Sequence, residues 1–100
     1  MPISSLRTSF FSRLLFRVRV SGESMWPELV NGRRYWASSL LRPRAGSHVV
    51  FQNPWGEGMF VKKVSRVVGD GYEVTSLVPW GSGSKDFGLV SKGNIIGVLT

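Results

Sequence analysis

One serine of this chain stands where an expected strand gives way to a turn that contains a proline. Residues 20–32 read VSGESMWPELVNG, and the pattern G-x-S-M-x-P is centred on Ser24. A serine in such a turn can be a nucleophile, because backbone N–H groups are exposed beside it and can stabilise an oxyanion. The pattern therefore predicts a site of nucleophilic chemistry, for which Ser24 would need further groups from other elements.

The first need is a base, because a serine hydroxyl is a poor nucleophile at neutral pH. His48 is the one histidine, with no carboxylate evidently placed to orient it, and a lone histidine is more often structural. A lysine can serve if burial lowers its pKa enough to make it neutral. Lys62 and Lys63 lie in the otherwise apolar run 59–64, where successive strand side chains face opposite sides. Either one lysine points inward at Ser24, or both are exposed edge-strand charges that discourage aggregation.

Four segments together resemble the signal peptidase I-type serine endopeptidases, within the wider group that includes the LexA-like self-cleaving repressors. They are residues 20–29, residues 42–51 (similar to PGDVVVF), residues 60–64 (similar to YIKRV), and residues 83–90 (similar to DSRxFGxV) followed by IIG at 95–97. The four segments follow one another in the same order as in the family, so the similarity is less easily due to chance than that of a single motif. The resemblance implies a Ser/Lys dyad, with Ser24 as the nucleophile and Lys62 as the general base. A subtype with little membrane anchor resembles the proteases proposed to mature nickel-type superoxide dismutase.

The resemblance also implies roles for the residues beside the nucleophile. The backbone N–H of Ser24 would stabilise the oxyanion, with Gly22 and Met25 as positioning neighbours. Gly22 would also keep the approach to the serine open. Trp26 and Pro27 would contact the substrate, an extended peptide that pairs with a strand edge and has small side chains before the cut.

The chain departs from the family pattern in the loop before the last segment. Residues 76–78 read SLV where the family has GDN, Gly83 replaces an aspartate and Lys85 replaces an arginine. Because those family residues support the lysine, the departures remove expected neighbours of Lys62. In the first segment, Glu28 stands where a threonine is common.

Composition limits the fold and the chemistry. One hundred residues fit one small domain, and 12 glycines among valine-rich runs favour short strands with tight turns over a helical bundle. The chain has no cysteine, which excludes disulfides, cysteine-ligated metals and thiol nucleophiles, and no cofactor or metal is expected. The net charge of +7 is concentrated in arginines of the N-terminal half. It indicates either a solvated basic surface or attraction to anionic lipid head groups or nucleic acid, of which nucleic acid is the disfavoured partner.

The expected domain, residues 16–100, is mainly β: a small coiled sheet like that of signal peptidases and LexA. Pro27 suits the first position of a helical turn, with Glu28 near its positive end. Gly69-Asp70-Gly71 is a hairpin signal. Alternation and apolar runs predict strands at residues 16–20, 34–37, 48–52, 59–68, 72–78, 87–90 and 95–99.

Residues 1–15 form a distinct segment with a basic amphipathic pattern. Phe10, Phe11 and Leu14 recur at helical spacing, with Arg13 on the other side. The segment is too short and too charged to span a bilayer. It either lies on a membrane surface or is a terminal helix docked on the domain or a frayed tail. The expected location is peripheral at a membrane or cytoplasmic.

Three classes of function remain. The first is an endopeptidase that removes signal or leader peptides from precursor proteins; its tryptophans (Trp26, Trp36, Trp55 and Trp80) either pack in the core or form a rim at the bilayer interface. The second is a LexA-like self-cleaving domain, which is disfavoured because the short stretch before Ser24 holds no DNA-binding module. The third is a catalytically impaired basic β module that binds lipid or nucleic acid, although no RNP-like box supports nucleic acid.

Overall fold

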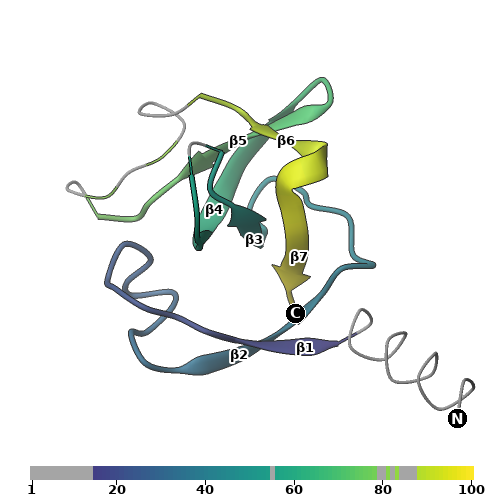
Figure 1. Cartoon of the computed structure of the whole chain (residues 1–100). Helices are drawn as coiled ribbons and strands as arrows, with labels where there is room; N and C mark the ends of the chain where they lie inside the picture. The colour runs from purple at the N-terminus through teal and green to yellow at the C-terminus, as the bar shows by residue number, and fades with distance from the viewer. Residues whose placement is uncertain (1–14, 55, 79–80, 82, 84–87) are drawn as a thin grey trace, which may run out of the picture.

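The computed structural model describes residues 15–54, 56–78, 81, 83 and 88–100, which form one antiparallel sheet of seven strands (Figure 1). The strand order across the sheet is β1-β2-β7-β3-β4-β5-β6. The prediction of a mainly β chain is therefore confirmed. The elements are β1 (Phe16–Arg19), β2 (Arg34–Ser38), β3 (His48–Gln52), β4 (Met59–Val68), β5 (Gly71–Thr75), β6 (Val90–Ser91), the 3-10 helix η1 (Lys92–Asn94) and β7 (Ile95–Leu99).

Most predicted strands are confirmed to within a residue or two at their ends. The hairpin signal is also confirmed, because β4 and β5 are antiparallel and Val68 lies opposite Gly71. The strand predicted over 72–78 ends early, at Thr75, because the backbone beyond it bonds elsewhere: the Leu77 N–H donates to the Ser24 carbonyl at 2.7 Å. The predicted N-terminal helix lies, apart from Leu15, outside the described residues.

Alternating side chains of the sheet form two apolar clusters. Because consecutive strand residues face opposite sides, β4 contributes to both clusters. The main core consists of Val49, Phe51, Val64, Tyr72, Val74, Val90 and Val98, with Phe60 and Ile95 packed against it. The second cluster, here called the loop core, consists of Val20, Met25 and Leu29, with Tyr35, Val61, Leu77 and Leu99 packed against it.

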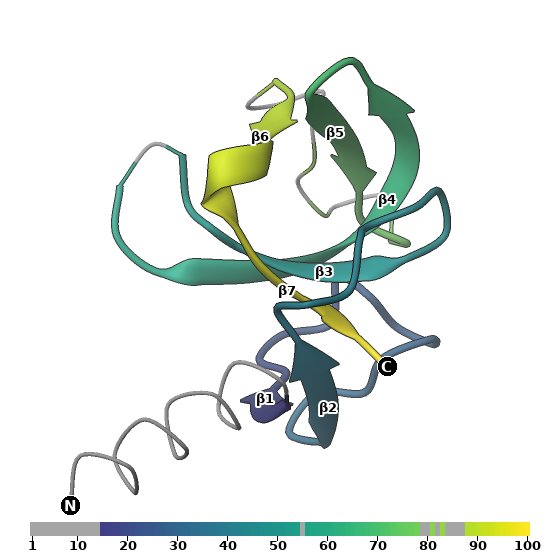
Figure 2. The ribbon, with the colours of Figure 1, turned by 90° about the vertical axis from the view of Figure 1, so that its right-hand side faces the viewer.

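The two ends of the sheet are separated in space. Both views show the β1–β2 hairpin at one end of the molecule and β5 with β6 at the other (Figures 1 and 2). Two strands have an extra residue in their ladders: Ile96 of β7 opposite Val50 and Phe51, and Ser65 of β4 between Val64 and Arg66. Such irregularities bend a strand and increase its twist. The loop between β1 and β2 holds the G-x-S-M-x-P motif.

Candidate active site

The serine loop, residues 21–31, is a folded unit and not an open connection between β1 and β2. Its base is closed by two backbone hydrogen bonds, from Val20 N–H to the Arg33 carbonyl at 3.0 Å and from Gly32 N–H to the Val20 carbonyl at 2.7 Å. The N–H of Gly22 donates to Asn31 Oδ1 at 3.0 Å, so the two sides of the loop are also joined above the base. Gly22 has a φ of +93°, a conformation that a residue with a Cβ rarely adopts.

Only one turn of the predicted helical segment forms inside this loop. Leu29 N–H donates to the Met25 carbonyl at 2.8 Å, which is the spacing of one helical bond. The next donor is diverted, because Val30 N–H binds the Tyr35 hydroxyl at 2.8 Å, and the helix does not continue. Met25 and Leu29 are buried in the loop core, so this turn is fixed to the sheet by apolar packing.

Ser24 lies at the junction between the serine loop and the segment that follows β5. Its carbonyl accepts the Leu77 N–H, as described above. A Cβ added at Gly81 would stand 3.3 Å from the Ser24 Cβ and would overlap the side chain of Ser76. The Ser24 and Ser76 side chains therefore meet at Gly81. Among the described residues, the N–H and hydroxyl of Ser24 have no hydrogen-bond partner.

Lys62 is buried on the main-core face of β4, with 4% of its surface exposed. Val49, directly opposite on β3, is fully buried, and the Lys62 ammonium lies 5.8 Å from the centroid of the Phe60 ring. The neighbouring Lys63 keeps 30% of its side chain exposed. Of the two sequence-based alternatives, the structure therefore has one inward and one outward lysine.

The β4–β5 ladder ends beside Lys62, and the segment that follows β5 leads to the serine loop. The last pair of the ladder is Lys63 with Thr75, so Lys62 directly precedes this pair in β4 and Ser76 directly follows it after β5. Ser76 is partly buried, and its hydroxyl donates to the Val78 carbonyl at 3.0 Å. The segment that contacts Ser24 through Leu77 thus leaves the sheet next to the end of the ladder that carries Lys63.

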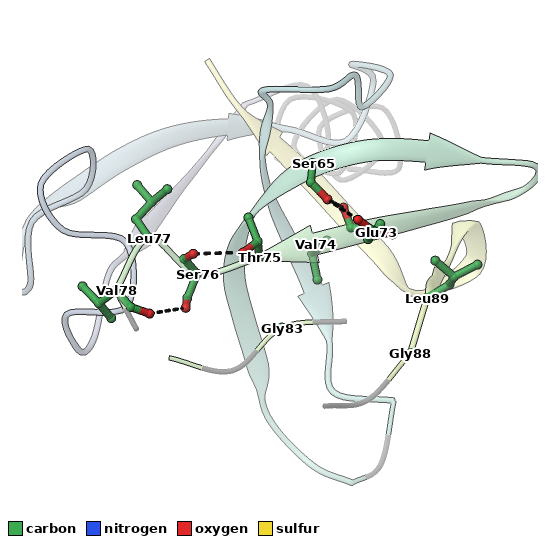
Figure 3. Close-up of a pocket in the computed structure, with 10 residues that line it drawn as sticks. All are labelled: Ser65, Glu73, Val74, Thr75, Ser76, Leu77, Val78, Gly83, Gly88 and Leu89. Carbon is green, nitrogen blue, oxygen red and sulfur yellow. Dashed lines mark hydrogen bonds between the residues drawn. The ribbon is translucent and has the colours of Figure 1, made fainter. Parts of the chain in front are cut away.

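A hollow of about 710 Å³ begins at this segment and extends along β5 (Figure 3). Residues 76–78 lie at one end of it and Gly88 and Leu89 at the other. A volume of this size is typical of ligand sites. Its lining consists of Ser65, Glu73, Val74, Thr75, Ser76, Leu77, Val78, Gly83, Gly88 and Leu89.

A second polar cluster, which the sequence analysis missed, joins the serine loop to the other face of β4. Glu28 Oε2 accepts a hydrogen bond from Lys63 Nζ at 2.9 Å, and its Oε1 lies 2.7 Å from His48 Nε2. Since a carboxylate only accepts, Nε2 carries the proton. The expectation that no carboxylate orients His48 was wrong, because His48 and Lys63 are directly opposite in the β3–β4 ladder and Glu28 reaches both. No short stretch of the sequence predicts that His48 and Lys63 pair across β3 and β4, because the register joins distant segments.

The ionic partners change the proton affinity of Glu28. The hydrogen bond from Lys63, followed by that from His48, holds the pKa of the Glu28 carboxyl below its ordinary value. The carboxylate is therefore ionised at neutral pH and holds both contacts. Its side chain is 38% exposed, so water screens these contacts in part.

The other predicted site residues occupy varied positions. Because the Gly22 N–H is bonded to Asn31, Gly22 shapes the loop and does not offer a donor to substrate. Trp26 and Pro27 are exposed beside Ser24, as substrate contacts would need to be. Trp36 is exposed on β2 under the Arg17 guanidinium, 4.8 Å from its ring centroid. Trp55, Trp80 and Lys85 lie outside the described residues.

No family model, curated protein or solved structure matches the chain. In the part of the chain that the structure describes, no helix is long and apolar enough to cross a bilayer. In that same part, histidines and carboxylates do not gather in groups of three or more as metal ligands would.

Proposed function

We propose that the chain is a serine endopeptidase of the signal peptidase I type, with the coiled β-sheet fold of that group. Ser24 is the nucleophile and Lys62 the general base, and the substrates are N-terminal signal or leader peptides of precursor proteins. One observation carries the proposal: Lys62 is buried beside the end of the β4–β5 ladder, and the segment that leaves this ladder contacts Ser24 at Leu77 and Gly81. The order of the four sequence segments supports the same assignment.

The reaction needs a neutral lysine at the start, and burial disfavours the charged ammonium. The Ser24 hydroxyl oxygen attacks the carbonyl carbon of the scissile peptide bond while Lys62 Nζ takes the hydroxyl proton. The tetrahedral intermediate collapses, the carbon–nitrogen bond breaks, and Lys62 gives its proton to the leaving amine. Water, deprotonated by Lys62, then hydrolyses the Ser24 ester and releases the acid.

The oxyanion of the intermediate needs a preorganised donor. The Ser24 N–H is the proposed donor, since it has no hydrogen-bond partner among the described residues. Met25 fixes this part of the loop, because its side chain is buried in the loop core. Gly22 leaves open space above its Cα, where no atom lies within 4 Å of a would-be Cβ.

The test is cleavage of a leader peptide by the purified full chain. Peptides that span a leader junction with small side chains before the cut are incubated with the protein, and mass spectrometry identifies the products. In acid-quenched samples, the wild type should carry the acyl fragment on Ser24, and Ser24→Ala should not. If no peptide of the panel is cleaved or forms the adduct, the peptidase proposal is wrong.

A second observation favours contact with an anionic membrane surface. In the β1–β2 ladder Arg17 lies opposite Trp36 and Arg19 opposite Arg34, and all four side chains are exposed. Opposite residues share a face, so the hairpin has an aromatic and basic surface. Arginines bind lipid phosphates, and tryptophan favours the head-group region. We propose that this surface brings the peptidase to precursors held at a membrane.

Flotation of the full chain with anionic vesicles tests this surface. Arg17→Ser with Arg19→Ser should reduce binding strongly, whereas Arg42→Ser with Arg44→Ser, which removes the same charge from another exposed site, should reduce it less. Equal losses would mean that net charge alone drives binding. Binding to single-stranded RNA in preference to vesicles would instead favour the nucleic-acid alternative.

A further inference from the structure

Within the described residues, Glu28 is the one charged residue of the serine loop that forms an ion pair with another part of the fold. It stands four residues after Ser24, in the turn closed by the Leu29 N–H bond to Met25. Both of its carboxylate oxygens are used, one by Lys63 at 2.9 Å and the other by His48 at 2.7 Å. The two contacts are short and charge-assisted, which makes them directional.

The partners of Glu28 come from two neighbouring strands. His48 is the first residue of β3, Lys63 lies in β4, and the two are directly opposite in the ladder. Lys63 also directly follows Lys62 in the chain. A displacement of Glu28 relative to Lys63 is thus a displacement of the serine loop relative to the backbone that carries Lys62.

We infer that Glu28 is a positioning residue for the proposed Ser/Lys reaction: it ties the loop of the nucleophile to the strand of the base. The inference rests on the proposed function for its catalytic part, while the tie itself is a property of the fold. Two other attachments hold the loop, the apolar packing of Met25 and Leu29 and the bond from Leu77 to Ser24. The apolar packing includes Val61, which directly precedes Lys62, and Glu28 adds a directional polar contact at Lys63, which directly follows it.

The expected effect is on the rate more than on folding. Partly exposed ion pairs contribute little to the free energy of unfolding. Reacting groups, in contrast, must be held in near-attack geometry, and a misplacement of about 1 Å can cost about 10²-fold in rate. Residues that hold catalytic groups in place can therefore affect kcat without touching the substrate.

The experiment compares Glu28→Ala with Arg66→Ala in the full chain. Arg66→Ala is the matched control, because it breaks an ion pair of similar length, 3.0 Å to Glu73, farther along the same strand. Glu28→Ala should lower kcat by about 10- to 100-fold and leave KM within about twofold. Glu28→Gln, whose amide oxygen still accepts a hydrogen bond, should recover part of kcat. Adding Lys63→Ala to Glu28→Ala should cost little more, because the two residues act through one contact.

A second readout does not depend on peptidase activity. In Glu28→Ala, the amide protons of Leu29 and Trp26, which close the turn on Met25 and Glu23, should exchange with solvent several-fold faster. Arg66→Ala should leave these two amides unchanged. Unchanged exchange in Glu28→Ala overturns the inferred tie, and faster exchange with an unchanged kcat overturns its role in catalysis. If the wild type cleaves no peptide, the proposed function fails by itself, and exchange still decides whether the tie exists.

Discussion

The two faces of strand β4 at its neighbouring lysines differ in nearly every physical respect. Lys62 is 4% exposed, lies opposite the buried Val49, and has its Nζ 5.8 Å from the centroid of the Phe60 ring. Lys63 keeps 30% of its side chain exposed and binds a carboxylate from the serine loop. One peptide bond thus separates a buried lysine from a partly exposed lysine that forms an ion pair.

This difference shows how one strand can serve two tasks in a small domain. Successive strand side chains face opposite sides of the sheet. The proposed base and the lysine that binds the serine loop can therefore be adjacent in sequence and separate in space. The serine loop makes two polar attachments: Ser24 meets the segment after β5 near Ser76 and Gly81, and Glu28 binds Lys63 on the outward side of β4. If this comparison is right, substitutions on the two faces should have different consequences.

The largest effects should come from the nucleophile and base themselves. Ser24→Ala and Lys62→Ala should each lower kcat/KM for leader-peptide cleavage by more than about 10³-fold, because removing either member disables the dyad. Lys63→Ala should have a smaller effect, through the contact with Glu28 alone. Steady-state kinetics on one peptide substrate provides the measurement. A severe loss in Lys63→Ala with normal activity in Lys62→Ala would reverse the assignment of the two faces.

The next effect should come from the space between Ser24 and Ser76. In Gly81→Ala, the new methyl group overlaps the Ser76 side chain and stands 3.3 Å from the Ser24 Cβ, so one of them must move. Activity should fall on the order of 10²-fold. The free energy of unfolding should fall by about 1–3 kcal/mol. Gly93→Ala is the control, because nothing lies within 4 Å of its would-be Cβ. Full activity in Gly81→Ala would mean that the reaction does not depend on the position of the Ser24 side chain beside Gly81 and Ser76.

Local sequence patterns predicted most of the sheet. The alternation at residues 16–20 and the Gly69-Asp70 turn are short-range signals, and both match the structure. The rule of opposite faces also gave one inward lysine as one of two alternatives for Lys62 and Lys63, and the structure has that arrangement. These predictions depend on neighbours within a few residues, which a single sequence displays directly.

The remainder depends on contacts between distant segments. The early end of β5 at Thr75 follows from the Leu77 bond to Ser24, and the partners of Glu28 follow from the β3–β4 register. Strand register is set by which whole faces become buried, so it is not written in any one segment. The sequence therefore indicated Glu28 as a residue near a helix start, and its ionic role emerged only with the fold.

A smaller effect tests the two faces through stability. Lys62→Met should change the free energy of unfolding by no more than about 1–2 kcal/mol, because the apolar side chain of similar length keeps the packing while the polar contacts of the buried amine are lost. Lys63→Met should lower it by less than about 1 kcal/mol, because a partly exposed ion pair is lost. Urea unfolding at pH 7 measures both variants. A large loss of stability in Lys62→Met would show that this lysine is a structural residue.

The smallest effect concerns Glu28 and its dependence on pH. Since the folded-state pKa of Glu28 is lowered from the ordinary 4.5, its contribution to stability is present above the unfolded pKa and is lost as pH falls through the folded value. Wild type should therefore be more stable than Glu28→Gln at pH 7, by less than about 1 kcal/mol given the exposure of the side chain. The difference should shrink below about pH 4.5.

Urea titrations at successive pH values measure this difference. Glu73 has a pKa lowered in the same direction by its hydrogen bonds from Arg66 and Ser65, so acid weakens the wild type through both carboxylates. Glu73→Gln is therefore the parallel variant, and only Glu28→Gln should combine the acid-sensitive loss with faster exchange of the serine-loop amides. A stability difference between wild type and Glu28→Gln that stays constant down to low pH would mean that the Glu28 charge does not hold the loop. In that case Lys62 and Lys63 would still differ in burial, but the ion pair of Lys63 with Glu28 would not hold the serine loop in place.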